Sequence, residues 1–404
     1  MKNRVFFVAL ALVLALSLAG LGCPDPIEPE PELTVYTLWT EEAERQAFNA
    51  VLAEFEDQTG IQVTHTAVDT DTMLVTFPTA FAAGTSPADV VLAPWSAWIV
   101  DLSDHLLPVG ELLDEDEFTA AHLDPVTEAG QLYGAPFKMA GKPGFWYKPS
   151  FFATHDLTPP ATYDEFVELL ADLDEIPELE APIASGNGVG WPLSDQVEGF
   201  IIGLGGYQLQ LDLIQGTVAW TDDVVREDVF GPLVDLLEAG YFSVPDEWGT
   251  QVEQLDAEVY GMMWMGDWII GMVEDSDDID FFPFPQTDGV VGAIDYAIVT
   301  EYTDWPDEAR ELVGFLATSE AQEIWAEIGG YLAPNAEVPL DIYPPAARSV
   351  AEFMLTVTVV PDLDDTIGGA FQSTFWDQLK LLWVNPDLVD DVLEEIEEDA
   401  PQPA

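Results

Sequence analysis

Apolar positions follow two different periods in the first part of the chain. The segments 33–38, 61–65 and 89–92 have the apolar, β-branched composition that is typical of strands. Between them, apolar residues recur at helical spacing, first in a helix that opens near Glu41 and then in a helix over 72–83. This alternation of strands and helices predicts a parallel sheet that is covered by helices.

Turn chemistry predicts further helix boundaries later in the chain. A capping box opens an amphipathic helix over 162–173, and a second box at 319–322 opens a helix through Ile328. Pro306 suits the first position of a helix that runs to Ala317. The total length of 404 residues favours two domains.

The N-terminus has the layout of an export signal. Lys2 and Arg4 precede an apolar run over 5–18, and small residues follow the run, as in a secretory signal peptide that covers 1–22. The apolar run is shorter than the roughly 20 residues that a membrane-spanning helix needs. We therefore expect an exported protein rather than one with a membrane-spanning anchor.

The only cysteine, Cys23, follows this segment directly. The sequence Ala19-Gly-Leu-Gly-Cys23 resembles the lipobox of bacterial lipoproteins, although Gly20 stands where leucine is usual. The resemblance implies that the thiol is acylated and anchors the chain to the outer face of the cell membrane. Residues 23–32, rich in proline and glutamate, predict a semi-rigid tether. The alternatives are signal cleavage without lipid and a structural thiol; an intrachain disulfide is excluded.

The net charge is very negative for a chain with so much apolar material. There are 76 acidic and 10 basic residues, which gives a formal charge of −66, yet 48% of the residues are hydrophobic and 13 are tryptophan. This composition predicts a folded protein with an acidic surface rather than a disordered chain. Such a surface repels nucleic acid and anionic membranes. We expect a monomer that binds no nucleic acid and reaches the membrane only through its lipid anchor.

Catalytic and metal-binding motifs are missing from the sequence. It contains no GxSxG, HExxH, Walker or EF-hand loop, and its four histidines lack metal-ligand spacing. The glycines of 186–190 depart from the GxGxxG spacing and predict a loop, and the acidic run 275–280 lacks the glycine of a calcium loop. We therefore expect no enzyme activity, no cofactor and no metal.

Six segments, in the same order along the chain, resemble extracytoplasmic solute-binding proteins of the family that includes maltose-binding protein, in particular the branch that serves α-glucoside importers. The segments are 142–149, 190–195, 281–285, 315–322, 329–334 and 374–376. The resemblance implies an α/β, two-lobed periplasmic-binding-protein fold (Venus flytrap, type II) with hinge crossovers. It places the N-terminal lobe at 33–138 plus 287–330 and the C-terminal lobe at 139–286 plus 331–404. It also implies capture of a small sugar, such as an α-glucoside, for the permease of an ABC importer.

The ligand is expected between the lobes, beyond the carboxyl ends of the strands. A sugar offers an apolar ring face and a rim of hydroxyls, so aromatic plates and carboxylates suit it. On this geometry the candidate ligand-binding residues are Trp39, Glu41, Asp69, Asp71, Trp95, Trp98, Lys142, Trp191, Asp195, Trp264, Asp267, Trp268, Asp295, Tyr296 and Trp376. Lys142 is expected to pair with a carboxylate of the site, donate to a sugar hydroxyl or form a salt bridge at the hinge. Trp146 and Trp325 are expected in the core.

Two other interpretations stay open. The same fold can bind a polyamine, a metal or a peptide, and the acidity of the chain favours a cation while the tryptophans favour a sugar. A secreted hydrolase or an adhesive surface lipoprotein is the other alternative, although the missing catalytic motifs count against a hydrolase.

The charge also generates a prediction about salt. Self-repulsion at this charge density destabilises a compact state, and concentrated salt relieves it by shortening the Debye length to about 3 Å at 1 M. We therefore expect a halophilic protein whose melting temperature rises as the salt concentration is raised. Thermal melts across a salt series measure this, and undiminished stability in dilute buffer would remove the idea.

Overall fold

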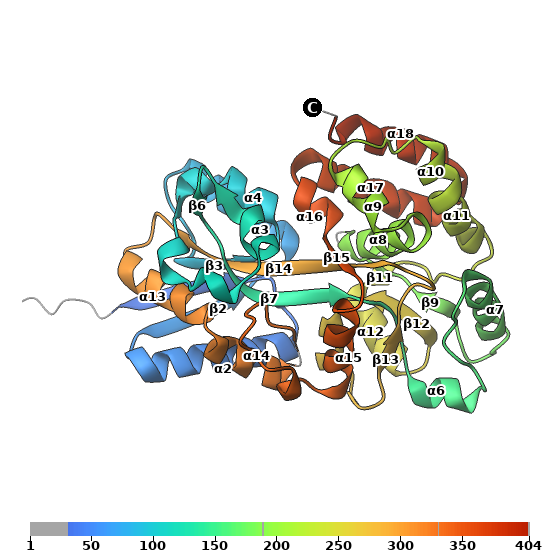
Figure 1. The fold of residues 1–404 in the computed structure, drawn as a ribbon, viewed down its shortest axis with the longest axis horizontal. Coiled ribbons are helices and arrows are strands. Elements are labelled where there is room, and N and C mark those ends of the chain that lie inside the picture. The colour runs from blue at the N-terminus through green and yellow to red at the C-terminus, as the bar shows by residue number, and fades with distance from the viewer. Residues whose placement is uncertain (1–30, 188–189, 330, 403–404) are drawn as a thin grey trace, which may run out of the picture. The chain divides into compact units, whose positions relative to one another are not determined.

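The computed structural model describes residues 31–187, 190–329 and 331–402. The fold contains two larger mixed sheets with helices packed on them (Figure 1). The predictions for the signal peptide, for Cys23 and for nearly all of the tether lie outside these residues. Glu32, which we placed at the end of the tether, is instead the first residue of strand β1. Among the described residues, no helix combines the length and the apolar character that membrane crossing requires.

The first sheet contains the parallel strands that the sequence pattern predicted. Its order is β15-β14-β3-β1-β2, and β4 and β7 also pair with β14. β1 runs parallel to both β2 and β3, and β14 is antiparallel to β3. The strands are β1 (Glu32–Thr37), β2 (Gln62–Ala67), β3 (Val90–Ala93), β4 (Leu106–Leu107), β7 (Ala135–Lys142), β14 (Gly289–Thr300) and β15 (Thr358–Pro361).

The second sheet is smaller and has the order β13-β8-β12-β9. β8 is antiparallel to both of its neighbours, whereas β12 and β9 are parallel. Its strands are β8 (Gly144–Tyr147), β9 (Ala181–Ala184), β12 (Tyr260–Met265) and β13 (Asp280–Phe282). Two short ribbons complete the strands, β5 (Thr127–Glu128) with β6 (Gln131–Leu132) and β10 (Gly186–Asn187) with β11 (Asp246–Glu247).

Helices connect most of the strands and cover both sheets. They are α2 (Glu42–Thr59), α3 (Thr70–Ala82), α4 (Ser96–Asp101), α5 (Ala120–Leu123), α6 (Pro149–Thr154), α7 (Tyr163–Asp174), α8 (Trp191–Gly205), α9 (Tyr207–Ile214), α10 (Asp223–Val225), α11 (Gly231–Glu238), α12 (Trp248–Asp256), α13 (Pro306–Leu316), α14 (Ser319–Gly329), α15 (Pro345–Met354), α16 (Leu363–Ile367), α17 (Gly369–Val384) and α18 (Val389–Asp399). Short 3₁₀ and π turns lie between them.

The two predicted capping boxes differ in outcome. At α7 the hydroxyl of Thr162 accepts a hydrogen bond from the Glu165 amide at 3.2 Å, as predicted, while the Glu165 side chain accepts from the Ala161 amide at 2.8 Å rather than from the Thr162 amide. At α14 the cap is Thr318, one residue earlier than predicted, and it accepts from the Ala321 amide at 3.3 Å. Gln322 therefore does not complete a capping box. Its buried side chain donates to the Pro136 carbonyl at 3.0 Å instead.

The paired strands β7 and β14 connect the two parts of the fold. They are hydrogen-bonded in antiparallel register from Ala135–Ala297 to Lys142–Val291, and Figure 1 shows them passing from the helices around the first sheet to those around the second. β15 pairs with the opposite edge of β14. The predicted lobe boundary at 138/139 falls inside β7, and the exact boundaries stay a prediction.

Each sheet packs against a cluster of aromatic side chains. Below the first sheet, the Trp39 ring lies 4.9 Å from Phe48 and 4.6 Å from Trp325 between centroids. Beside the second, Phe145 contacts Phe166 at 4.9 Å. Trp146 and Trp325 are fully buried, as expected for core residues. The two cores hold the fold without any disulfide among the described residues.

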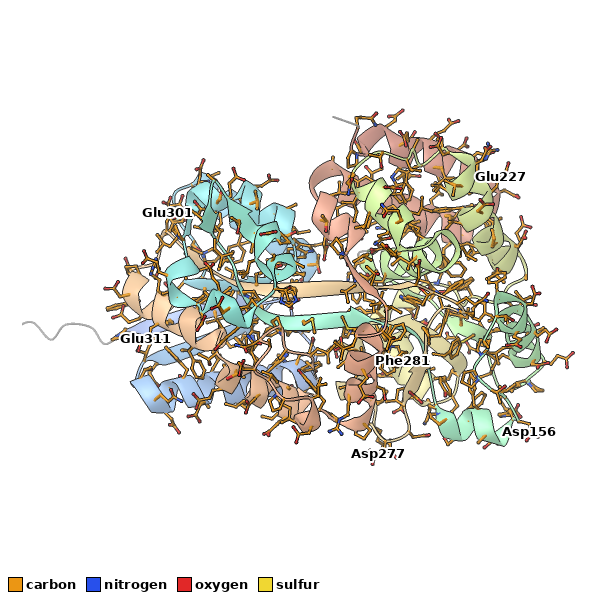
Figure 2. The ribbon with its side chains drawn as sticks, in the orientation of Figure 1. Asp156, Glu227, Asp277, Phe281, Glu301 and Glu311 are labelled. Carbon is orange, nitrogen blue, oxygen red and sulfur yellow. The ribbon has the colours of Figure 1, made fainter. Side chains whose placement is uncertain are left out.

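The basic side chains neutralise little of the acidic surface, because there are 10 of them against 76 acidic residues. Arg226 pairs with Asp390 at 2.7 Å, Lys380 with Asp377 at 2.6 Å, and Arg348 donates only to backbone carbonyls. Meanwhile acidic side chains cover separate parts of the surface, and Figure 2 shows the exposed Asp156, Glu227, Asp277, Glu301 and Glu311 pointing outward. The remaining negative charge of the surface is therefore screened by water and dissolved ions.

Candidate functional site

A cavity of about 350 Å³ lies where segments from both parts of the fold meet. On one side its wall comes from the residues that follow β1, β2 and β3, as expected for ligand sites of open α/β sheets. On the other side the wall comes from the starts of α8 and α12, from the segment after β15, and from α17. Its volume falls in the range of roughly 300–1,000 Å³ that is usual for small-molecule pockets.

Strands β7 and β14 supply one continuous part of the cavity wall. Alternate residues of a strand point to the same face, and the lining residues follow this rule: Lys138, Ala140 and Lys142 on β7, with Ala293 and Asp295 on β14. The strand pairing sets Lys138 opposite Asp295 and Ala140 opposite Ala293. Backbone register therefore fixes where both lysines stand.

Lys138 is buried among carboxylates and aromatic rings. Its Nζ atom lies 3.1 Å from Glu44 Oε1 and 4.0 Å from Asp295 Oδ2. Four rings surround it at 5.4–5.9 Å from their centroids, namely those of Trp39, Trp268, Trp325 and Tyr331. Burial alone would lower the pKa of Lys138, but the carboxylates outweigh it and the pKa is raised. Lys138 is thus a fixed positive charge in the wall.

Lys142 forms the second buried cation of the site. Its Nζ lies 2.5 Å from Asp195 Oδ1 and also contacts Asp362 Oδ2. Burial opposes its charge, but the surrounding carboxylates raise the pKa of Lys142 well above its ordinary value. Of the roles considered for Lys142, pairing with carboxylates of the site is what the structure shows. These pairs join β7 to α8 and to the segment after β15.

Six of the 13 tryptophans line the cavity: Trp39, Trp95, Trp191, Trp248, Trp268 and Trp376. Hydrogen bonds hold two of them, because Trp39 Nε1 donates to Asp295 at 3.0 Å and Trp376 Nε1 donates to Asp364 at 2.7 Å. The Trp191 ring packs edge-to-face with those of Trp248 and Trp268, with 5.4 and 5.7 Å between the ring centroids. The rings are therefore held in place before any ligand arrives.

Trp191 and Asp195 both belong to helix α8 (Trp191–Gly205). Helix α8 begins at Trp191, so these residues stand one turn apart on the same face. Gly190, which precedes the helix, has φ +126°, and a Cβ atom there would lie 2.5 Å from Trp376 Cβ. Glycine at 190 thus lets α8 begin directly against a tryptophan of the cavity.

Nine of the 15 predicted site residues line the cavity, and six do not. The nine are Trp39, Asp69, Trp95, Lys142, Trp191, Asp195, Trp268, Asp295 and Trp376. Glu41 precedes α2, Asp71 is exposed on α3, and Trp98 packs against Trp95 from behind at 5.9 Å.

The other three residues outside the cavity wall are buried elsewhere. Trp264 packs against Phe145 in the core of the second sheet at 5.1 Å. Asp267 is fully buried and accepts a hydrogen bond from the Gly141 amide at 3.1 Å. Tyr296 lies inside β14, next to Asp295, and adjacent strand residues point to opposite faces.

Several charged and aromatic residues of the wall were missed from the sequence: Glu44, Lys138, Glu247, Trp248, Asp362, Asp364 and Asp365. Lys138 carried a usable signal, because basic residues are scarce and it stands four residues before Lys142, hence on the same face of a strand. The aspartates at 362, 364 and 365 follow a short apolar strand, which also marks a strand end. Leu38, Thr40, Thr70, Pro94, Ala140 and Ala293 complete the wall and carry no such signal.

Comparisons with known proteins agree with this architecture. The chain matches the family of bacterial extracellular solute-binding proteins over residues 39–323, and it belongs to that family. Its members are binding proteins, so this chain is a solute-binding protein and not an enzyme.

Relatives match nearly the whole chain. An uncharacterized ABC transporter extracellular-binding protein of Pyrococcus horikoshii is 44% identical over 416 residues and covers 99% of both chains. The osmoprotective compounds-binding protein GgtB of Synechocystis is 27% identical, covering 92% of this chain and 93% of its own. The α-glucosides-binding periplasmic protein AglE of Rhizobium meliloti is 26% identical, covering 81% and 77%.

Solved structures show the same two-lobed fold. The bacterial solute receptor AcbH, described as preferring β-D-galactopyranose, superposes with a TM-score of 0.81 at 19% identity, covering 92% of this chain and 98% of its own. The predicted α/β, two-lobed fold and the predicted family are therefore confirmed.

Asp267 generates a prediction about pH. Burial raises the pKa of Asp267 from 3.8 to about 7, and its Oδ2 atom has no hydrogen-bond partner. The folded state thus favours the neutral carboxyl group, so its contribution to the free energy of unfolding is lost as the pH rises from about 4 through about 7, by up to about 4 kcal/mol. In Asp267→Asn, which keeps an acceptor for Gly141, this part of the pH dependence should disappear.

Urea unfolding between pH 4 and pH 8 at constant high salt measures the effect. The matched control is Asp71→Asn, which also removes one carboxylate but from an exposed position. Its pH profile should parallel that of the wild type. Identical profiles for all three proteins would show that the Asp267 carboxyl group is not neutral in the fold.

Proposed function

We propose that this protein is the substrate-binding component of a carbohydrate ABC importer, which binds a small sugar in the cavity and delivers it to the permease. The observation that carries the proposal is the cavity wall, which combines six tryptophan rings with eight acidic side chains. Ring faces suit the apolar face of a pyranose, and carboxylate oxygens accept hydrogen bonds from its hydroxyls. The nine predicted residues in the wall and Lys138, Glu44 and Trp248 are the proposed ligand-binding residues.

The relatives support both the assignment to an ABC importer and a small sugar as its solute. AglE is named for α-glucosides, and AcbH is described as a galactopyranose receptor, so small sugars are ligands of this fold. An α-glucoside or another small oligosaccharide is our first candidate. The proposed mechanism is closure of the two lobes about β7, β14 and β15, driven by contacts that only the closed form makes with the solute.

A cationic solute is the second candidate, and one observation favours it. Eight acidic residues line the cavity against two lysines. An unbalanced negative wall attracts a polyamine or another cation. The six tryptophans suit a sugar as well as a cation, because aromatic faces also bind cations. Direct binding measurements separate the two classes of solute.

Calorimetric titration with a panel of mono- and oligosaccharides, with spermidine as the cationic arm, tests the ligand class. We expect a sugar to bind with a dissociation constant near micromolar, about −8 kcal/mol. Trp191→Ala should weaken binding at least about tenfold, or about 1.4 kcal/mol, because it removes a ring face. If spermidine alone gave a heat of binding, or if none of the sugars did, the carbohydrate assignment would be rejected. The assignment to the solute-binding family would still stand.

Trp305→Ala is the matched control for this titration. Trp305 is also half-buried, and it lies before α13, outside the cavity wall. It should keep the affinity of the wild type, while thermal melts show that both variants fold. Equal weakening in the two variants would mean that Trp191 acts only through stability.

We further propose that acylation of Cys23 anchors the mature protein beside its permease, where the tether raises their effective concentration. Replacing Cys23 with alanine should release a binder with unchanged affinity into the medium. Fractionation of the expressing cells, followed by the same calorimetry, measures both properties. Retention of the variant on the membrane would refute the lipid anchor, and loss of binding would give the thiol a structural role.

A further inference from the structure

Five carboxylates surround Lys142 in and next to the cavity wall. They are Asp195, Glu198, Asp362, Asp364 and Asp365. All but Asp365 are at least 95% buried, and Glu198 is completely buried. One ammonium group is the only positive side chain that contacts this group among the described residues. Buried carboxylates are very costly unless they are paired or bind a cation, so this excess needs a partner.

Two oxygens of the group have no hydrogen-bond partner. Asp195 uses Oδ1 for Lys142, while its Oδ2 is buried and unpaired. Glu198 uses Oε2 to accept from the Leu363 amide at 2.8 Å and from Gln210, while its Oε1 is buried and unpaired. Both residues lie on α8, one turn apart, and the side chains are at most 2% exposed. Native folds rarely leave such acceptors empty.

The two side chains that carry these unpaired oxygens lie close to a third carboxylate. Asp195, Glu198 and Asp362 each offer an oxygen, and the three oxygens lie within 4.8 Å of one another. Two ligands on opposite sides of a Ca²⁺ ion, each at about 2.4 Å, are separated by about the same distance. Carboxylate oxygens without nitrogen or sulfur ligands select hard cations. We propose that Asp195, Glu198 and Asp362 hold a divalent, oxygen-preferring cation in the wall of the cavity.

The position of these residues gives the cation a structural role. Asp195 and Glu198 belong to α8, whereas Asp362 lies between β15, which pairs with the hinge strand β14, and α16. An ion that binds all three residues would tie α8 to the segment between β15 and α16. Asp195 and Asp362 also line the cavity, so the ion would fix two side chains that face the solute. This inference goes beyond the proposed sugar binding and does not depend on it.

The test is a calcium titration of the full mature chain without any solute. After treatment with a chelator and dialysis into KCl at constant ionic strength, CaCl₂ is titrated into the wild type, Glu198→Gln and Glu168→Gln. Glu168 is an exposed residue of α7, so its variant removes a matched carboxylate from the surface. The wild type and Glu168→Gln should show one high-affinity site, and Glu198→Gln should lose at least tenfold in affinity at that site.

Weak binding to surface carboxylates should be the same in all three proteins and serves as an internal baseline. If Glu198→Gln lacks the native thermal transition, Asp195→Asn replaces it as the test variant. The proposal is overturned if the wild type shows no site above this baseline, in which case protons satisfy the buried oxygens. Equal calcium affinity in Glu198→Gln and Glu168→Gln would overturn it too, because the ion would then bind elsewhere.

Discussion

Antiparallel hydrogen bonding between β7 and β14 is the constraint on which the site depends. The pairing runs from Ala135–Ala297 to Lys142–Val291, and it carries a continuous ribbon from the first sheet toward the second. Because side chains alternate along a strand, the ribbon presents Lys138, Lys142 and Asp295 to one cavity. A shift of one residue in register would turn these three side chains to the opposite face. The register of the two strands thus decides where both lysines of the cavity stand.

The scarcity of positive charge explains why those two lysines matter. The chain has 10 basic residues against 76 acidic ones, and two of the ten are buried in the cavity wall. Most of the other acidic groups face solvent, where ions screen them. Dissolved ions cannot screen the buried carboxylates of the cavity wall. Ion pairs with Lys138 and Lys142 offset part of their negative charge instead. The same acidic composition therefore has different physical consequences on the surface and in the cavity.

Local patterns predicted the fold well and the site only in part. Apolar periodicity located β1, α2, β2, α3 and β3 because each depends on residues that are close in sequence. Trp191 and Asp195 were found through a recognisable motif, but their position at the start of a helix was not. Glu44 and Asp362 were missed because their roles depend on lysines 94 and 220 residues away. Pairings at that distance leave no local pattern.

Two errors among the predicted residues, Tyr296 and Asp267, have the same physical cause. Asp295 faces the cavity and Tyr296 does not, although both are polar-tipped residues in one strand. Trp268 lines the cavity, while Asp267 turns inward to the Gly141 amide. In both pairs the sequence identifies the segment, but the face is decided by the neighbouring strand or turn. The identity of the solute lies beyond the same limit, because it depends on where carboxylate oxygens from six separate segments of the wall meet the solute.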